Sequence, residues 1–411
     1  MSFLSLKLAL RNLSRNRMRS GITLLVIGSG SIAMIIAGGF IEDTVRQVRE
    51  SSIRDLLGHL RVYKRGYLEN GVLKPYDYMI LDPSSLAQRL SAHPYVVNVG
   101  PRLTYFGLIG NGDITMPFIM QAFDPALESR LRNTTAMKMG HFIEPNKPYD
   151  VLLGEGLAKA LNLKMGDSPV LVGNTQHGAM NASDVNVVGV FQTLSKDFDD
   201  SGIRAPIQLA QKLLRVDGAQ MLVLFLDRTE HTEAVKRWLQ ALFARENLDY
   251  EVQAWYELPD AAFVSTTENV YRSIYKVIKI VLFLFVILSI MNTMNMAVLE
   301  RVGEIGTLMA LGTPRRGIWR LFLAEGIIMG LLGGALGCSV GCLLARVISW
   351  IGIVMPNPPG TQVQWIARIR VTPGIVASAF TMAFATSLIS SVLPALKASK
   401  LEIAEALRHN V

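Results

Sequence analysis

Four long apolar runs without a charged residue constrain this 411-residue chain more than any other feature. Each run has about 20 residues or more, enough to cross roughly 30 Å of hydrocarbon as a helix. The runs are Ser20–Ile41, Ile280–Leu299, Gly326–Ala345 and Val371–Leu396. No comparable run lies between Glu42 and Lys279, so that stretch is predicted to be water-soluble. The fold class predicted is membrane α-helical, with four transmembrane helices and a large α+β extracytoplasmic domain inserted between helices 1 and 2.

Basic residues in front of the first run predict its orientation. Lys7, Arg11, Arg15, Arg17 and Arg19 precede it without an acidic residue among them. Because basic flanks remain cytoplasmic, both termini and the segment after the second run are predicted to be cytoplasmic. The soluble domain would then lie outside the cell membrane. Much of the net charge of +8 comes from such flanking residues, so no nucleic-acid partner is predicted.

The runs divide the chain into predicted parts. These are 1–57 (cytoplasmic arm, first transmembrane helix and stalk), 58–266 (two-lobed α+β domain, with an inserted lobe at about 124–202), 267–299 (stalk and second transmembrane helix), 300–320 (cytoplasmic helix), 321–345 (third transmembrane helix), 346–370 (outer loop), 371–396 (fourth transmembrane helix) and 397–411 (cytoplasmic tail). Within the soluble domain, β-rich runs predict strands at Leu60–Tyr63, Thr104–Ile109, Phe118–Phe123, Val170–Val172, Val185–Phe191 and Met221–Leu226. Helical spacing predicts helices at Ser84–Ala92, Glu155–Leu161, Pro206–Leu214 and Thr232–Glu246.

Regularly spaced glycines mark the third run. Gly333, Gly337 and Gly341 form one row, and Gly330 and Gly334 form a second. Because small residues let helix backbones approach closely in a membrane, these rows predict helix packing. The packing partner is either another transmembrane helix of the chain or a second copy.

Polar residues also enter the membrane runs. Asn292 and Asn295 flank Met294 in the second run, and they either form hydrogen bonds between helices or line a path for an amphipathic substrate. Glu325 stands at the start of the third run. Such a carboxylate is a functional candidate, but its spacing from Arg320 favours a charge pair at the interface.

Motifs of catalysis are absent from the sequence. It contains no GxxxxGK[ST], HExxH or GxSxG pattern, and its six histidines are scattered. Cys338 and Cys342 share a helix face inside the third run, where small packing residues are expected. We therefore predict no catalytic residue, no metal site and no cofactor bound by this chain.

The segment from Glu300 to Arg316 joins the second and third runs. Its apolar face contains Val302, Ile305, either Leu308 or Met309, and Gly312. The other face contains Glu300, Arg301 and Glu304. A helix this short is marginal alone in water and must dock against something. It either lies on lipid headgroups or acts as a coupling helix that inserts into a cytoplasmic motor. The residues alone leave both interpretations open.

Three stretches resemble a known family. Glu300-Arg-Val-Gly-Glu-Ile-Gly-Thr-Leu-Met-Ala-Leu-Gly312, with Phe322-Leu-x-Glu325 and Gly333-Gly-x-x-Gly337, resembles the permeases of the MacB/FtsX-like (type VII) ABC transporter superfamily. The start, 9–19, and the ending, 393–407, are similar to the same family. Within this family, the sequence segments 58–67 and 154–167 are most similar to the lipoprotein-releasing LolC/LolE permeases.

This resemblance implies a mechanism of mechanotransmission. Two copies of a separate ABC ATPase would bind ATP and Mg and drive a pair of permeases, identical or paralogous, in a bacterial inner membrane. The substrate would be a lipid, a lipoprotein or another hydrophobic molecule, passed to a periplasmic carrier or adaptor. The coupling residues implied are Glu300, Glu304, Ile305, Gly306, Leu308, Met309, Ala310, Leu311 and Gly312.

Two other functions fit the same resemblance. One is a MacB-like efflux permease that works with a periplasmic adaptor and an outer-membrane channel. The other is an FtsX-like signalling protein that transports nothing and activates a cell-wall hydrolase. The sequence does not choose the substrate.

Overall fold

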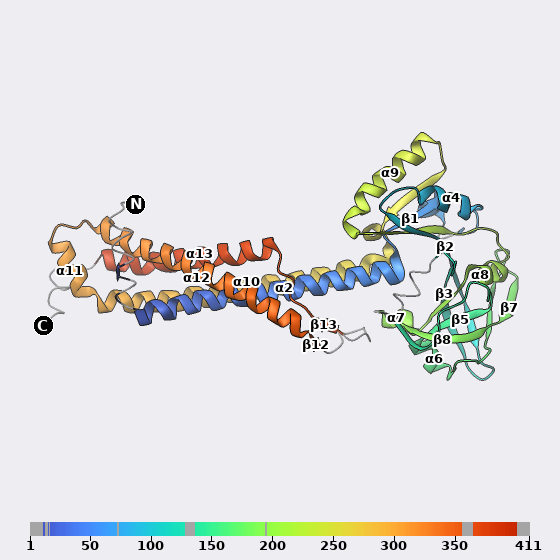
Figure 1. Ribbon diagram of the computed structural model, residues 1–411, viewed down its shortest axis with the longest axis horizontal. Coiled ribbons are helices and arrows are strands. Elements are labelled where there is room, and N and C mark those ends of the chain that lie inside the picture. The colour runs from blue at the N-terminus through green and yellow to red at the C-terminus, as the bar shows by residue number, and fades with distance from the viewer. Residues whose placement is uncertain are drawn as a thin grey trace. The chain divides into compact units, whose positions relative to one another are not determined.

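The computed structural model describes residues 11–12, 15, 17–71, 74–127, 136–193, 195–355 and 365–400. The chain folds into two compact units (Figure 1). The helical unit comprises Met1–Val45, Glu268–Val354 and Ile366–Val411, and the α/β unit comprises Arg46–Thr267 and Met355–Trp365. The ends of the predicted N-terminal arm (1–10) and tail (401–411), and 356–364 of the predicted outer loop, lie outside the described residues.

Four helices among the described residues are long and apolar enough to cross a membrane. They are α2 (Arg17–Ser52), α10 (Ala262–Glu300), α12 (Arg315–Ile351) and α13 (Pro373–Ser399). Each of α2, α10 and α12 contains one of the predicted runs and extends well beyond it, whereas α13 begins two residues inside the fourth run. After α12, β12 (Ile353–Met355) pairs with β13 (Trp365–Ala367).

The predicted cytoplasmic segment 300–320 contains one complete helix and the start of another. Only the short helix α11 (Val302–Ala310) occupies its centre, and its last six residues belong to α12. The break has a local cause, because Gly312 adopts a positive φ of 92° and Pro314 precedes the first residue of α12. Glycine tolerates this left-handed backbone, and proline cannot continue the preceding helix.

The two glycine rows of α12 lie against two different helices of the same chain. A Cβ on Gly337 would stand 2.7 Å from the Gly28 Cα of α2, and one on Gly333 would meet Ile27. In the second row, a Cβ on Gly330 would lie 3.0 Å from the Ser387 Cβ of α13. Gly341 faces α2 and Gly334 faces α13 in the same way. Both rows are therefore filled within one chain, without a second copy.

A mixed sheet of 11 strands forms the α/β unit. Its main path is β11-β1-β10-β2-β3-β9-β5-β8-β4, with β6 joined to β2 and β7 to β6. The bounds are β1 (Leu60–Lys64), β2 (Val96–Gly110), β3 (Thr115–Phe123), β4 (Ala136–Gly140), β5 (Asp150–Gly154), β6 (Val170–Asn174), β7 (Met180–Asp184), β8 (Asn186–Gln192), β9 (Gly202–Pro206), β10 (Met221–Leu226) and β11 (Tyr250–Ala254). The pairs β3–β9 and β5–β8 are parallel, and the other pairs are antiparallel.

Short helices connect these strands. They are α3 (Tyr67–Asn70), α4 (Pro83–Leu90), α6 (Glu155–Ala160), α7 (Lys196–Asp199), α8 (Ile207–Leu214) and α9 (Thr232–Arg245), with the π-helix η1 (Ile53–Leu57) and the 3₁₀ turns η2 (Thr229–His231), η3 (Trp255–Glu257) and η4 (Pro259–Ala261). Asp82 caps α4 by accepting a hydrogen bond from the Ser85 N–H at 3.1 Å.

The two largest hydrophobic cores among the described residues of this unit lie beside smaller clusters. In one, α4 and α9 pack on β1, β10 and β11 through residues such as Leu86, Leu239 and Leu224. In the other, Leu103 of β2 shares a core with Leu153 of β5 and with α8. The boundary between the cores thus falls within β2, rather than at residue 124, where the sequence places the start of an inserted lobe.

Buried arginines hold η1, which directly follows α2, to the sheet. Arg61 donates to the carbonyls of Leu57 at 2.9 Å and Leu56 at 3.2 Å, and Arg204 donates to the carbonyl of Asp55 at 2.8 Å. Both arginines are at most 7% exposed. Guanidinium groups are favourable at a helix C-terminus because its last carbonyls lack helical partners.

His59 joins the same region to the end of β10. Its Nδ1 accepts from the Leu226 N–H at 3.1 Å, so its Nε2 carries the proton toward the Thr229 hydroxyl at 3.2 Å. The Thr229 hydroxyl in turn lies 3.0 Å from a carboxylate oxygen of Glu50 on α2. Burial lowers the pKa of His59 to about 4, so this imidazole is neutral at pH 7.

Candidate functional site

Helix α11 has one face packed into the helical unit. Ile305 and Met309 are buried, and they share a cluster with residues from three long helices. The partners are Val298 of α10, Ile318 and Phe322 of α12, and Ala395 and Ala398 of α13. This packing fixes α11 against the ends of three candidate transmembrane helices. A displacement of α11 would therefore disturb its contacts with all three helices.

The opposite face of α11 and the turn after it are exposed. Leu308 is 38% exposed and Leu311 is 80% exposed, although both are apolar. Glu304, Ala310 and Gly312 are also exposed, whereas Gly306 is buried with Ile305 and Met309. The structure therefore places Met309 on the inner face and Leu308 on the outer one. Among the predicted coupling residues, only the exposed ones can touch a partner through their side chains.

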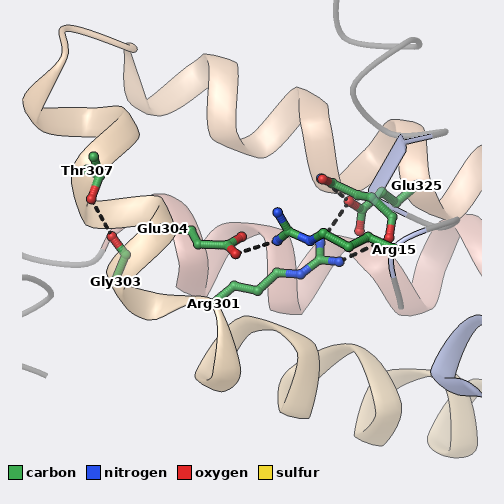
Figure 2. Close-up of polar contacts among 7 residues, drawn as sticks. Arg15, Arg301, Gly303, Glu304, Thr307 and Glu325 are labelled. Carbon is green, nitrogen blue, oxygen red and sulfur yellow. Dashed lines mark hydrogen bonds and ion pairs between the residues drawn. The ribbon is translucent and has the colours of Figure 1, made fainter. Parts of the chain in front are cut away.

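A buried ion pair anchors the start of α11 (Figure 2). Arg301, immediately before the helix, donates to Glu325 of α12 at 3.2 Å, and their side chains are 10% and 6% exposed. The Asn12 amide donates to the same carboxylate at 2.9 Å, and Arg301 donates to the Asn12 carbonyl at 3.4 Å. Charges buried this far from water persist when they are paired and hydrogen-bonded.

This pair corrects two predictions. Arg301 does not lie on the exposed face of α11 with Glu304, because it precedes the helix and turns inward. Glu325 pairs with Arg301 and Asn12, whereas Arg320 is exposed. The five-residue spacing between Arg320 and Glu325 places them off a common helix face, since neighbours on a helix are three or four residues apart.

Two further ion pairs join residues before and within α2 to the region of α11. Arg15 pairs with Glu304, as Figure 2 shows, and Arg19 pairs with Glu300 at the end of α10. Within α11, the Thr307 hydroxyl donates to the Gly303 carbonyl at 2.9 Å. Sequence reasoning used the N-terminal basic cluster only to orient the chain. The opposite charges of this basic cluster and of Glu300 and Glu304 were the sequence signal from which contact between the N-terminal segment and the α11 region could have been predicted.

The structure places the three residues of the predicted substrate path in different environments. Met294 is buried in a cluster with Ile27 of α2 and Met329 of α12, so it packs between helices. Asn292 is exposed and Asn295 is half-buried. The three residues therefore do not line one common surface.

Metal-binding side chains do not gather in the described part of the chain, where no three His, Cys, Asp or Glu side chains lie close enough together to hold a metal ion. Cys338 lies within a hydrophobic cluster with Met34 and Ala379, and the partly buried Cys342 packs against this cluster. At α11, the structure shows a helix packed on one face and exposed on the other.

Two protein-family models match this chain in consecutive parts of the sequence. The family model "MacB-like periplasmic core domain" matches residues 20–242, and the model "FtsX-like permease C-terminal" matches residues 276–403. An uncharacterized ABC transporter permease of Methanocaldococcus jannaschii is 25% identical over 423 residues, which cover 97% of this chain and 96% of the relative.

Two relatives with more specific names are similar at comparable levels. The lipoprotein-releasing system transmembrane protein LolC of Xylella fastidiosa is 26% identical over 338 residues, covering 77% of this chain and 78% of the relative. The pyoverdine export ATP-binding/permease protein PvdT of Pseudomonas putida is 25% identical over 429 residues, covering 98% of this chain and 59% of the relative.

Long apolar helices together with a periplasmic-type α/β unit define a multi-pass membrane protein. Because one family model alone covers residues 20–242, more than half of the sequence, and a second covers most of the remainder, the family is established. The chain belongs to the type VII ABC transporter permeases, the family of the MacB-like and LolC/LolE proteins.

Proposed function

We propose that this chain is the permease subunit through which a separate ABC ATPase moves a lipoprotein or another hydrophobic substrate out of the inner membrane. In this proposal α11 lies in the cytoplasm and receives the movement of the ATPase. The α/β unit lies in the periplasm and handles the substrate there.

One observation carries this proposal: α11 is packed on one face and exposes apolar side chains on the other. The inner face is fixed by Ile305 and Met309, while the outer surface presents the exposed leucines Leu308 and Leu311. An amphipathic helix with exposed apolar side chains is suited to a hydrophobic groove of a partner protein. A lipid-headgroup location would explain the leucines but not the packing against three helices.

The energy source is proposed to be another polypeptide. PvdT is named an ATP-binding/permease protein, and this chain matches 59% of its length. This chain also lacks a GxxxxGK[ST] phosphate-binding motif. We therefore place ATP and Mg on a partner ATPase, present in two copies beneath a pair of permeases, identical or paralogous.

Similarity to LolC, a lipoprotein-releasing system transmembrane protein by name, supports a lipoprotein substrate, and we propose a periplasmic carrier as its acceptor. Efflux through an adaptor is the second candidate, favoured by the similarity to PvdT, a pyoverdine exporter by name. The first is preferred because this chain matches 78% of the length of LolC and 59% of that of PvdT.

The test compares two leucines of matched exposure. Leu311 of the α11 turn is 80% exposed, and Leu81 of the α/β unit is 76% exposed. In proteoliposomes containing the full-length chain and the ATPase that co-purifies with it, Leu311→Ser should weaken ATPase binding about tenfold, as for an interface hot spot. Leu81→Ser is the control and should bind like the wild type.

If Leu311→Ser binds the ATPase and supports its activity as well as Leu81→Ser does, α11 is not the coupling element. The substrate is tested in the same vesicles with a triacylated lipoprotein and a soluble acceptor. ATP-dependent loss of a small amphiphile, with the lipoprotein retained, would favour efflux.

A further inference from the structure

The sheet of the α/β unit is split along one edge of β2. On this edge β10 pairs with residues from Val96 to Arg102, and β6 pairs with Leu108 to Gly110. Between them, residues 103–107 have β3 on the other edge and no strand of the described chain on this one. The Thr104 N–H faces the split, where the side-chain oxygen of Gln220 accepts it at 2.8 Å.

Phe106 has no paired strand of the described chain on this edge. Alternate residues of a strand face the same edge, so the Phe106 N–H and C=O point the same way as those of Thr104. Its cross-strand neighbour Ile119 donates its N–H away from β2, to the Ser201 carbonyl at 2.9 Å, which agrees with this alternation. An unpaired strand edge is a template for another extended chain.

Two cavities on the open face of the sheet meet at the split. Their volumes are about 750 Å³ and 460 Å³, and both are lined by Arg61, Thr104, Phe106, Met221 and Asp260. We call the combined space the open-face trough. The side chains of Phe106, Leu108 and Met180 line it while 64%, 47% and 79% exposed. Its size and its apolar lining are those of a ligand site.

Three polar atoms of trough-lining residues have no hydrogen-bond partner. They are the Tyr105 hydroxyl, the Gln121 Oε1 and the Gln253 Oε1. The Tyr105 side chain is only 3% exposed, and buried polar groups in proteins nearly always have a partner. Two of the three atoms are acceptors, which require N–H or O–H donors. A polypeptide backbone supplies such donors, and an acyl chain does not.

Two glycines in the trough lining let parts of the α/β unit itself pack closely. A Cβ on Gly173 would stand 2.0 Å from the Tyr105 hydroxyl, and one on Gly107 would stand 2.4 Å from the Val172 carbonyl. Both glycines line the larger cavity. Glycine is required at these places because Tyr105 and the β6 backbone occupy the space that a side chain would need.

Residues next to the two membrane-crossing helices also line the trough. Leu56 belongs to η1, directly after α2, and Asp260 lies two residues before α10 begins. Both residues are thus close in sequence to candidate membrane-spanning helices, which favours the transported molecule over a soluble partner as the occupant.

We infer that the open-face trough binds an extended, unacylated polypeptide segment of the transported substrate. Its backbone pairs with Phe106 and donates N–H groups to Gln121 and Gln253, and its apolar side chains contact Leu108 and Met180. The identity of this polypeptide as substrate rests on the proposed function. Peptide binding itself requires no ATPase.

The test uses the full-length chain in detergent, without ATPase or ATP. A randomised library of unacylated decapeptides is selected on the wild type, and retained peptides are measured on variants. Phe106→Ser should weaken their binding about tenfold, the equivalent of about 1.4 kcal/mol, whereas Leu81→Ser should not. Because no ATPase is present, failure here leaves the coupling test at Leu311 unaffected.

Tyr105→Phe separates ligand binding from a structural role. It should weaken peptide binding while the melting temperature stays equal or rises, because it removes a polar group that lacks a partner in the free protein. Tyr149→Phe is the control, since that hydroxyl has a partner in Lys212, and it should leave peptide binding unchanged.

Three results would overturn the inference. The first is a library in which no peptide is retained by the wild type above the Phe106→Ser variant. The second is a fall in melting temperature for Tyr105→Phe with peptide binding intact. The third is a fluorescent palmitate probe that binds in the trough and is not displaced by any retained peptide.

Discussion

Removing Glu325 tests whether the buried ion pair holds α11 in place. In Glu325→Leu, Arg301 keeps its charge at 10% side-chain exposure but loses its carboxylate partner. The Asn12 amide loses its acceptor at the same time. The leucine itself is compatible with the apolar surroundings of α12, so the predicted damage comes from the uncompensated charge.

The size of the expected loss in folding stability follows from the burial of the pair. Removing one partner of a buried ion pair costs about 3–5 kcal/mol, whereas replacing both partners by apolar residues is often nearly neutral. We therefore expect Glu325→Leu to destabilise strongly and Arg301→Met/Glu325→Leu to recover most of the loss. The Arg15–Glu304 pair, in which Glu304 belongs to α11, is the control, because its side chains are 54% and 53% exposed. Breaking an exposed pair costs about 0.2–1 kcal/mol.

The assay is unfolding of the full-length chain from detergent micelles by increasing fractions of a denaturing detergent, followed by circular dichroism. The wild type, both single variants and the double variant form a double-mutant cycle. We expect a coupling energy of about 2 kcal/mol or more for Arg301 and Glu325, given the buried-pair range. The same cycle on Arg15 and Glu304 should give less than about 1 kcal/mol.

Additive effects at Arg301 and Glu325, within about 0.5 kcal/mol, would refute this reasoning. So would a Glu325→Leu variant as stable as Arg15→Ala. Either result would mean that the two charges are separately solvated rather than paired, and that apolar packing alone positions α11.

Acid should weaken the α/β unit through His59, since its pKa is lowered from 6.5 to about 4 by burial. The unfolded chain then binds a proton more readily, so this stability is complete above pH 6.5 and declines as the pH falls toward 4, by about 3 kcal/mol in total. Melting curves from pH 7 to 4 should show a flatter dependence for His59→Gln, and equal slopes would exclude His59 as the cause. Gly337→Ala should destabilise by about 1–3 kcal/mol, because its Cβ would meet the Gly28 backbone at 2.7–2.8 Å. Gly21→Ala, with nothing within 4 Å, should be neutral or stabilising in the same unfolding assay, and equal losses at both glycines would argue against close packing of α2 and α12.

Local pattern was sufficient to find α11 but not its partners. The apolar spacing marks Ile305 as inward, yet Leu308 and Met309 are adjacent and both apolar, so only packing against α10, α12 and α13 decides between them. Arg301 and Glu325 are 24 residues apart, on different elements. Sequence periodicity describes one helix at a time, so it cannot pair charges across a turn between helices.

In the α/β unit, the strands that were not predicted from the sequence contain residue types that are uncommon in strands. Only 104–109 of β2 was predicted, because Gly100 and Pro101 interrupt its earlier half, where β10 nevertheless pairs with it. The strand β9 contains Arg204, which is 1% exposed and reaches the Asp55 carbonyl. A buried arginine in a strand is explained by a helix end elsewhere in the fold, and no local pattern contains that information.

Helix α10 connects the α/β unit to α11 in the sequence. It is one helix from Ala262 to Glu300, with no proline or glycine in its sequence. At one end, Glu300 is followed directly by the buried Arg301; at the other, Ala261 and Val264 share a buried cluster with Leu57. Kinks in helices arise mainly at proline, glycine or π-bulges, so we expect α10 itself to resist kinking. Asp260, which lines the open-face trough, lies two residues before α10 begins.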